Sequence, residues 1–158
     1  MKIIQSDFMT AGTGTVTASG ANDTPGMVVE HTVKLGDVIE ALDVIEFFIL
    51  PPNYAVHDIK DISDPVDGDD AMTSRVGLLE GEPYDPVFAN RTTANAIGSE
   101  YLATGKPTVG GFRAPTTAAA YAVPVTKTLR SVGVQVVAAP TDLTVGQKFR
   151  LWVELRPL

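Results

Sequence analysis

The middle of the sequence is cut into short extended segments by turn-forming residues, and this pattern constrains the fold more than any other feature. A Pro-Pro-Asn turn at residues 51–53 interrupts an apolar run, two aspartates follow at 69–70, and the next run, 75–79, ends at Gly81. Proline fixes φ, glycine accepts positive φ, and aspartate bonds to its own backbone, so all three favour turns. Short extended runs between such turns predict an all-β fold.

Residues 27–35 alternate between apolar and polar side chains, which is the pattern of a half-buried strand. The polar side of this predicted strand includes Glu30, Thr32 and Lys34. The opposite side, which we expect to face the core, carries Met27, Val29, His31, Val33 and Leu35.

Residues 43–50 place apolar side chains on both faces, as in a strand that is covered on both sides. A helix remains an alternative, because apolar residues also recur at helical spacing in this part of the chain. They are Val38, Ile39, Leu42, Ile45 and Ile49. We favour the strand from Val44 onward, since β-branched and aromatic residues dominate there. With a second extended run from Tyr54 to Ile62, residues 43–62 predict a hairpin whose register breaks near Asp58.

The C-terminal part predicts a second hairpin, with one arm over residues 132–136, a turn over 140–146 and a final strand over 148–156. Strict alternation divides the final strand into two faces. The expected core face carries Phe149, Leu151, Val153 and Leu155. The opposite face carries Lys148, Arg150, Trp152, Glu154 and Arg156.

Two stretches, near residues 10–26 and 105–120, are dense in Gly, Thr, Ala and Pro and predict long flexible loops. Loops of that length in a compact domain are either functional or simply flexible. The chain of 158 residues is otherwise expected to form one β-sandwich domain over residues 1–158. A domain of this size buries roughly 70% of its unfolded surface.

Composition excludes several classes of partner. The chain carries a formal net charge of -7, and an acidic surface repels the phosphate backbone of nucleic acids, so we expect no nucleic-acid partner. No apolar run approaches the roughly 20 residues of a membrane helix, and the N-terminus lacks a signal-peptide stretch. We therefore expect no membrane partner and a product made in the host cytoplasm. The absence of cysteine excludes disulfides and thiolate metal sites.

No motif predicts catalysis, a cofactor or a metal. Six aspartates between residues 58 and 70 could supply oxygen ligands to calcium, but they lack the ligand order of a calcium-binding loop. They are Asp58, Asp61, Asp64, Asp67, Asp69 and Asp70. The two histidines, His31 and His57, have no G-x-S-x-G motif to accompany them, and the Gly-rich passages at 12–14 and 110–111 lack the features of a phosphate-binding loop. The triplet at residues 90–92 matches a glycosylation site only by coincidence.

Trp152 is the one large aromatic residue on an otherwise polar strand face, and tryptophan and arginine are enriched in protein interfaces. Arg150 and Arg156 share that face. Phe8 precedes the first long loop and Arg113 lies in the second. We therefore predict an interface formed by Phe8, Arg113, Arg150, Trp152 and Arg156. The alternative is that residues 105–120 simply cover Trp152.

Several segments together resemble the capsid cement proteins of tailed phages, which are also called decoration or head-stabilising proteins. The resemblance is carried by residues 49–58 (Ile-Leu-Pro-Pro-Asn-Tyr-Ala-Val-His-Asp), the aspartates at 69–70, residues 75–79 (Arg-Val-Gly-Leu-Leu) and residues 91–98 (Arg-Thr-Thr-Ala-Asn-Ala-Ile-Gly). It continues through residues 130–136 (Arg-Ser-Val-Gly-Val-Gln-Val), residues 144–147 (Thr-Val-Gly-Gln) and the final strand. These segments span about two thirds of the chain.

The resemblance implies a jelly-roll-like antiparallel β-sandwich that binds the outside of an icosahedral phage shell and bridges neighbouring major capsid proteins. It implies a location on the outer capsid surface of the virion, a homodimer or homotrimer, and no enzymatic activity. The alternative is a tail or fibre β-sandwich module that binds a host glycan or another virion protein.

Overall fold

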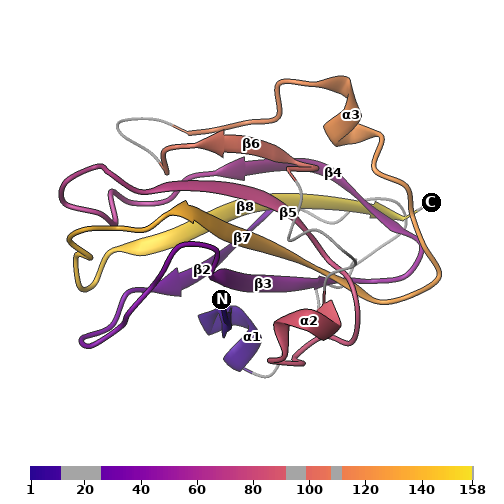
Figure 1. The fold of residues 1–158 in the computed structure, drawn as a ribbon. Coiled ribbons are helices and arrows are strands. Elements are labelled where there is room, and N and C mark those ends of the chain that lie inside the picture. The colour runs from indigo at the N-terminus through magenta and orange to yellow at the C-terminus, as the bar shows by residue number, and fades with distance from the viewer. Residues whose placement is uncertain (12–25, 92–98, 108–111, 158) are drawn as a thin grey trace.

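The computed structural model describes residues 1–11, 26–91, 99–107 and 112–157, and in it two β-sheets pack face to face (Figure 1). The larger sheet has the order β1-β3-β7-β5-β6 and the smaller sheet the order β2-β8-β4. All described pairings are antiparallel except that of β1 with β3. The all-β sandwich predicted from the sequence is thus confirmed.

The strands of the larger sheet are β1 (Ile3–Gln5), β3 (Val44–Leu50), β7 (Arg130–Ala138), β5 (Thr73–Leu79) and β6 (Leu102–Gly105). Those of the smaller sheet are β2 (Met27–Thr32), β8 (Lys148–Pro157) and β4 (Tyr54–Asp61). Three single-turn helices complete the described elements: α1 (Asp7–Thr10), α2 (Phe88–Arg91) and α3 (Ala118–Tyr121).

Every residue of β3 is buried, and the apolar side chains on both of its faces predict this for all of them except Glu46. One face of β3 packs into the core between the sheets, and α1 and α2 lie along the other side of the strand (Figure 1). The core side chains come from both sheets, including Phe47 and Val132 from the larger and Phe149 and Leu151 from the smaller. The helical alternative for residues 38–49 does not form.

Both predicted hairpins are wrong, because the chain changes sheets at each of the two turns. β3 lies in the larger sheet and β4 in the smaller, and β7 and β8 are separated in the same way. The first crossing uses the Pro-Pro-Asn turn, where Asn53 has a φ of 61°. Alternation identifies which side chains face inward, but a strand in either layer of a sandwich satisfies the same pattern.

Two finer predictions about register have opposite outcomes. The break near Asp58 is confirmed: Val56 pairs with Leu155 and Asp58 with Glu154, so that His57 is the extra residue of a bulge. The inward position of Leu35 is wrong, because its side chain is 90% exposed. β2 ends at Thr32, and the chain turns away through Gly36, whose φ of 87° suits glycine.

The predicted loops are described only in part. Residues 12–25 of the first and 108–111 of the second lie outside the described residues. Within the second, the expectation of a loop without regular structure is wrong at α3, where Ala120 is buried. Arg113 also forms an isolated bridge with Asp61 at the end of β4, which fixes this part of the segment to the smaller sheet.

A buried polar cluster lies on the side of the larger sheet that α2 covers. The carboxylate of Glu46 on β3 accepts hydrogen bonds from Arg91 Nη2 on α2 and, at 2.7 Å, from Gln5 Nε2 on β1. Arg91 also donates to Ser131 Oγ on β7 at 3.1 Å. This cluster ties three strands of the sheet to α2.

Candidate interface

Most of the side chains that the sequence predicts for an interface lie on the outer face of the smaller sheet. Burial alternates along β8. Its buried side chains are Phe149, Leu151, Val153 and Leu155, and its half-exposed side chains are Lys148, Arg150, Trp152 and Glu154. The predicted division of this strand into two faces is therefore confirmed. Cross-strand pairing sets Val28 of β2 and Lys60 of β4 on either side of Trp152.

Trp152 lies at the centre of a row of residues that crosses the sheet. The Nζ atom of Lys60 lies 4.5 Å from the centroid of the Trp152 ring and 5.8 Å from that of Phe112. Gly26 approaches the indole so closely that a Cβ atom there would collide with it. We call Gly26, Val28, Lys60, Phe112 and Trp152 the Trp152 row.

The Trp152 row is open to solvent. One of its members, Phe112, comes from residues 105–120, the segment that the sequence offered as a possible cover for Trp152. Phe112 is 63% exposed, Val28 is exposed, and Trp152 itself is half-buried. Phe112 contacts the ammonium group of Lys60 and leaves part of Trp152 accessible. A row that presents apolar and aromatic surface beside a cation has the composition of an interface centre.

Ion pairs flank the Trp152 row toward the start of β8. Glu30 contacts Lys148 Nζ at 2.5 Å and Arg150 Nε at 3.4 Å, and Arg150 also pairs with Asp64. The hydrogen bond from Lys148, together with Arg150 and despite partial burial, holds the pKa of Glu30 below its usual value. Arg150 is therefore held in a fixed position at the edge of the row.

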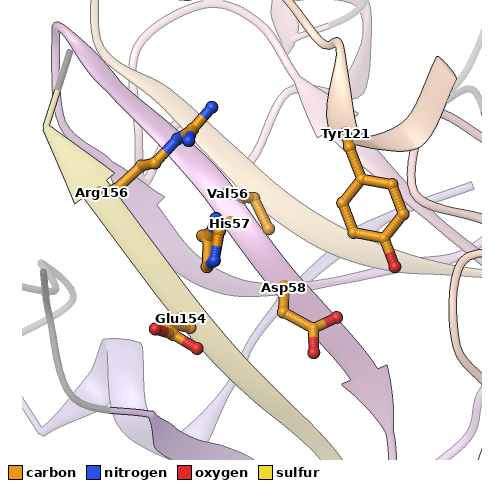
Figure 2. Close-up of a pocket in the computed structure, with 6 residues that line it drawn as sticks. All are labelled: Val56, His57, Asp58, Tyr121, Glu154 and Arg156. Atoms are coloured by element: carbon orange, nitrogen blue, oxygen red, sulfur yellow. The ribbon is translucent and has the colours of Figure 1, made fainter. Parts of the chain in front are cut away.

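A pocket of about 460 Å³ lies on the same face toward the end of β8. Figure 2 shows Tyr121, from α3, across from Asp58 on β4, while Glu154 and Arg156 extend from β8. The bulge at His57 exposes that ring at the pocket wall. Among the described residues, Glu154 and Arg156 form no ion pair within the chain, so their charges are available to a partner.

The five predicted interface residues do not form one surface. Arg150, Trp152 and Arg156 share the outer face of β8. The guanidinium of Arg113 forms hydrogen bonds within the chain: Nε donates to Asp61 Oδ2 at 3.0 Å, and Nη1 donates to the carbonyl oxygen of Ser74 at 2.9 Å. Phe8 lies on α1 and packs against the core. Contact of Arg113 and Phe8 with a partner stays a prediction.

The aspartates between residues 58 and 70 have separate partners. Asp58 pairs with Lys60, Asp61 with Arg113, Asp64 with Arg150 and Asp70 with Lys106. Asp69 accepts from Thr141 Oγ1 at 3.0 Å. In the described parts of the chain, no three His, Asp or Glu side chains gather as a metal site would require.

Asp67 has a structural role within this stretch. Its carboxylate accepts hydrogen bonds from the backbone N–H groups of Ala71, Met72, Thr141 and Asp142. Burial raises the pKa of Asp67, but these four donors outweigh burial and leave the pKa below its usual value. Asp67 therefore joins the start of β5 to the connection between β7 and β8.

The two histidines differ in their exposure to solvent. His57 is exposed at the pocket in Figure 2, whereas His31 on β2 is only 5% exposed. Burial lowers the pKa of His31, and Asp7 and Asp37 only partly offset this effect. The Gly-rich passage at 12–14 and residues 110–111 lie outside the described residues. No helix in the described ranges is long and apolar enough to cross a membrane.

Sequence reasoning missed Lys60 and Phe112, which complete the Trp152 row. Lys60 lies two residues after Asp58, so both side chains are on the same face of β4. This spacing could have placed Lys60 on the outer face, but the bulge made the assignment of faces in this strand ambiguous. Phe112 comes from a segment without periodicity, and only the tertiary structure brings it to Lys60.

Comparison with known proteins provides the functional context of this fold. No family model and no curated protein matches the sequence. A chain from the solved capsid of Ralstonia phage GP4 matches with a TM-score of 0.79 and 27% identity, over 99% of this chain and 98% of that chain. The protein is similar to a phage capsid chain.

A chain of the cyanophage Pam1 capsid asymmetric unit also matches, with a TM-score of 0.48 and 15% identity over 90% of this chain and 91% of that chain. The GP4 match carries the inference. It supports a structural role in a phage virion, in agreement with the broader part of the resemblance seen in the sequence.

Proposed function

We propose that the protein binds the outer surface of an icosahedral phage capsid and stabilises the shell by bridging neighbouring major capsid proteins. The observation that carries the proposal is the structural similarity, over nearly the whole length of both chains, to a chain of the Ralstonia phage GP4 capsid. The proposal includes assembly as a homodimer or homotrimer and assigns no enzymatic activity to the chain.

The charge of the chain supports an external position. A formal net charge of -7 gives the protein no attraction to packaged DNA, which carries one negative charge for about every 1.7 Å of duplex. A position outside the shell keeps the two acidic polymers apart.

The outer face of the smaller sheet supplies a surface suited to a protein partner. The Trp152 row offers aromatic area, and Glu154 and Arg156 beside it offer charges that no ion pair among the described residues neutralises. Aromatic centres surrounded by polar rims are typical of protein interfaces. We assign capsid contact to this face.

Binding of this kind stabilises a shell by mass action. A molecule that binds the assembled shell and not its free subunits shifts the equilibrium toward assembly. Each bridging copy also links two subunits, so that modest contacts act together.

The test is co-sedimentation of purified protein with expanded shells that lack it, with unexpanded shells as the control. Saturable binding to expanded shells alone is the expected result, and the plateau gives the number of copies per shell. Absence of binding to both shells would contradict the proposal and favour a tail or fibre module instead. Glycan-array binding would then test the glycan-binding form of that alternative.

A further inference from the structure

The outer face of β8 is divided into a half whose charges are paired within the chain and a half whose charges are not. Toward the start of the strand, Lys148 and Arg150 both contact Glu30. Toward its end lie Glu154 and Arg156, and neither side chain forms an ion pair within the part of the chain that the structure describes. The second half therefore presents one free negative charge and one free positive charge.

Glu154 lies beside a second carboxylate. Asp58 of β4 is its direct partner across the strands, and both residues line the pocket of about 460 Å³. Like charges directly opposite one another oppose the pairing of two strands. Lys60 neutralises Asp58, with its Nζ atom 3.1 Å from Oδ2 of that carboxylate. This part of the pocket has two carboxylates and one cation, so it suits a second cation from outside the chain.

Arg156 lies two residues beyond Glu154 and is exposed. Figure 2 shows the two side chains extending from β8 without meeting. Between them in sequence lies Leu155, which points into the core and is fully buried. Residues two apart on a strand share one face, about 7 Å from one another. The order of charges along the outer face of β8 is therefore acidic, then basic.

A face with this order of charges is complementary to itself. When a second copy is related by a two-fold axis that crosses β8 at Leu155, the two β8 strands run antiparallel across the contact. Residue 154 of each copy then meets residue 156 of the other, because a two-fold contact makes every pairing reciprocal. Sheets that pack face to face are about 10 Å apart, a distance that a glutamate and an arginine side chain span together.

We propose that the end of the outer face of the smaller sheet binds a second copy of this chain through two symmetric ion pairs between Glu154 and Arg156. The guanidinium of the second copy enters the pocket beside Glu154 and Asp58. Tyr121, which is 48% exposed on the wall across from Asp58, offers an aromatic face to it (Figure 2). The inference rests on the homodimer in the proposed function and names its contact. The capsid contact assigned to this face is then made by the Trp152 row.

A second copy fits these charges better than a partner of one sign. A basic partner would meet Arg156, and an acidic partner would meet Glu154 and Asp58, so each would bring like charges together. A partner with both charges in the reverse order avoids this repulsion. A copy of β8 has that order by symmetry alone.

The first test measures self-association by sedimentation equilibrium. The wild-type chain should form a dimer whose dissociation constant rises when NaCl is raised from about 0.05 M to about 0.5 M, because salt screens ion pairs. Glu154→Arg and Arg156→Glu should each raise that constant at least about tenfold, since each puts like charges at both contacts. Glu40→Arg makes the same reversal at an exposed residue between β2 and β3 and should dimerise like the wild type.

The second test combines the two reversals. An equimolar mixture of Glu154→Arg and Arg156→Glu should form a heterodimer more tightly than either variant forms a homodimer, because both contacts again join opposite charges. Native mass spectrometry identifies the heterodimer by its mass. A single chain that carries both substitutions should also regain self-association, with its charges exchanged. Variants that had merely lost stability would show neither rescue.

Several results would overturn the two-fold contact. They are a wild-type chain that stays monomeric up to about 1 mM, a trimer, a dimer that both reversals leave intact, and a mixture that does not associate. Loss of shell affinity with unchanged self-association would also overturn it, by assigning these charges to a contact with the capsid protein.

The self-association measurements are independent of the capsid function, because they need no shell. The protein can fail to bind shells while the dimer contact stands, and it can bind shells as a monomer. The salt dependence of the wild-type dimer also needs no variant. A dissociation constant that does not rise with salt would overturn the contact even if a charge reversal prevented folding.

Discussion

Arg91 on α2 and Glu46 on β3 are 45 residues apart in sequence and form an ion pair in which both side chains are 0% exposed. Removing one member of such a pair leaves the other charged and buried. The pair therefore holds α2 to the larger sheet more firmly than the few residues of that helix could by themselves.

Arg91→Leu should lower the free energy of unfolding by about 3–5 kcal/mol, because Glu46 would stay buried without its cation. Urea unfolding at neutral pH measures the loss. The control is Lys106→Leu, which removes the exposed pair with Asp70 and should cost less than about 1 kcal/mol. Equal losses in the two variants would contradict a structural role for the buried pair.

Val153→Asp should unfold the protein. Val153 is fully buried in the core on β8, and a carboxylate there would have no hydrogen-bond or ionic partner. Circular dichroism in the far ultraviolet shows the outcome directly. Glu154→Gln, one residue away on the outer face, serves as the control and should keep the native spectrum. A folded Val153→Asp variant would show that the strand can shift its register.

Trp152→Ala should weaken shell binding more than it weakens the fold. Trp152 is half-buried in the wild-type protein. The substitution removes its cation–π contact with Lys60, which is worth about 0.5–1 kcal/mol and is a small part of the stability of a domain. Co-sedimentation and urea unfolding of the same variant compare the two effects. Val87→Ala, at an exposed apolar residue elsewhere, should change neither. A large loss of stability with unchanged shell affinity would assign Trp152 to the core instead.

Stability should fall as the pH drops below about 6.5, the ordinary pKa of histidine. Burial lowers the pKa of His31, Asp7 and Asp37 only partly offset this effect, and Lys34 adds to it. The unfolded chain therefore binds a proton that the native chain excludes, so protons favour unfolding in this range. Urea unfolding at several pH values between 7.5 and 5 measures the slope.

His31→Phe should flatten that slope, because it removes the titrating ring from the core. His57→Gln, at the exposed histidine, is the matched control and should retain the wild-type slope. An unchanged slope in His31→Phe would assign the acid sensitivity to another group. A further loss is expected below about pH 4.5, where Glu30, Asp7 and Asp67 begin to be protonated in the unfolded chain, because hydrogen bonds lower the pKa of each in the native state.

A chelator should leave the melting temperature unchanged. The aspartates between residues 58 and 70 are neutralised by separate cations, backbone N–H groups and hydroxyl groups, so none of their contacts depends on a metal. Differential scanning calorimetry with and without EDTA provides the comparison, and calcium added back is the control. A melting temperature that falls with EDTA and recovers with calcium would contradict this reading of the aspartates.

Local patterns in the sequence predicted individual strands well. Alternation in β8 assigned Leu151 inward and Trp152 outward, and apolar side chains on both sides of β3 predicted its burial on both faces. The register break that the sequence predicted near Asp58 was also present, and the structure places it at His57. These features depend on a period of two along a strand, which is a property of the chain alone.

Pairing and the sites were decided by the tertiary structure. The sequence joined β3 to β4 as a hairpin, but a turn that crosses between layers has the same composition as one that stays within a sheet. Phe112 reaches Lys60, and Arg91 reaches Glu46, only because distant segments converge.

The sequence by itself determined the strand faces, the all-β class and the acidic surface, because these follow from side-chain order and composition. Only the tertiary structure decided which sheet each strand joins and which charges are paired. The physical reason is that burial and ion pairing depend on neighbours from distant parts of the chain, which local periodicity does not encode.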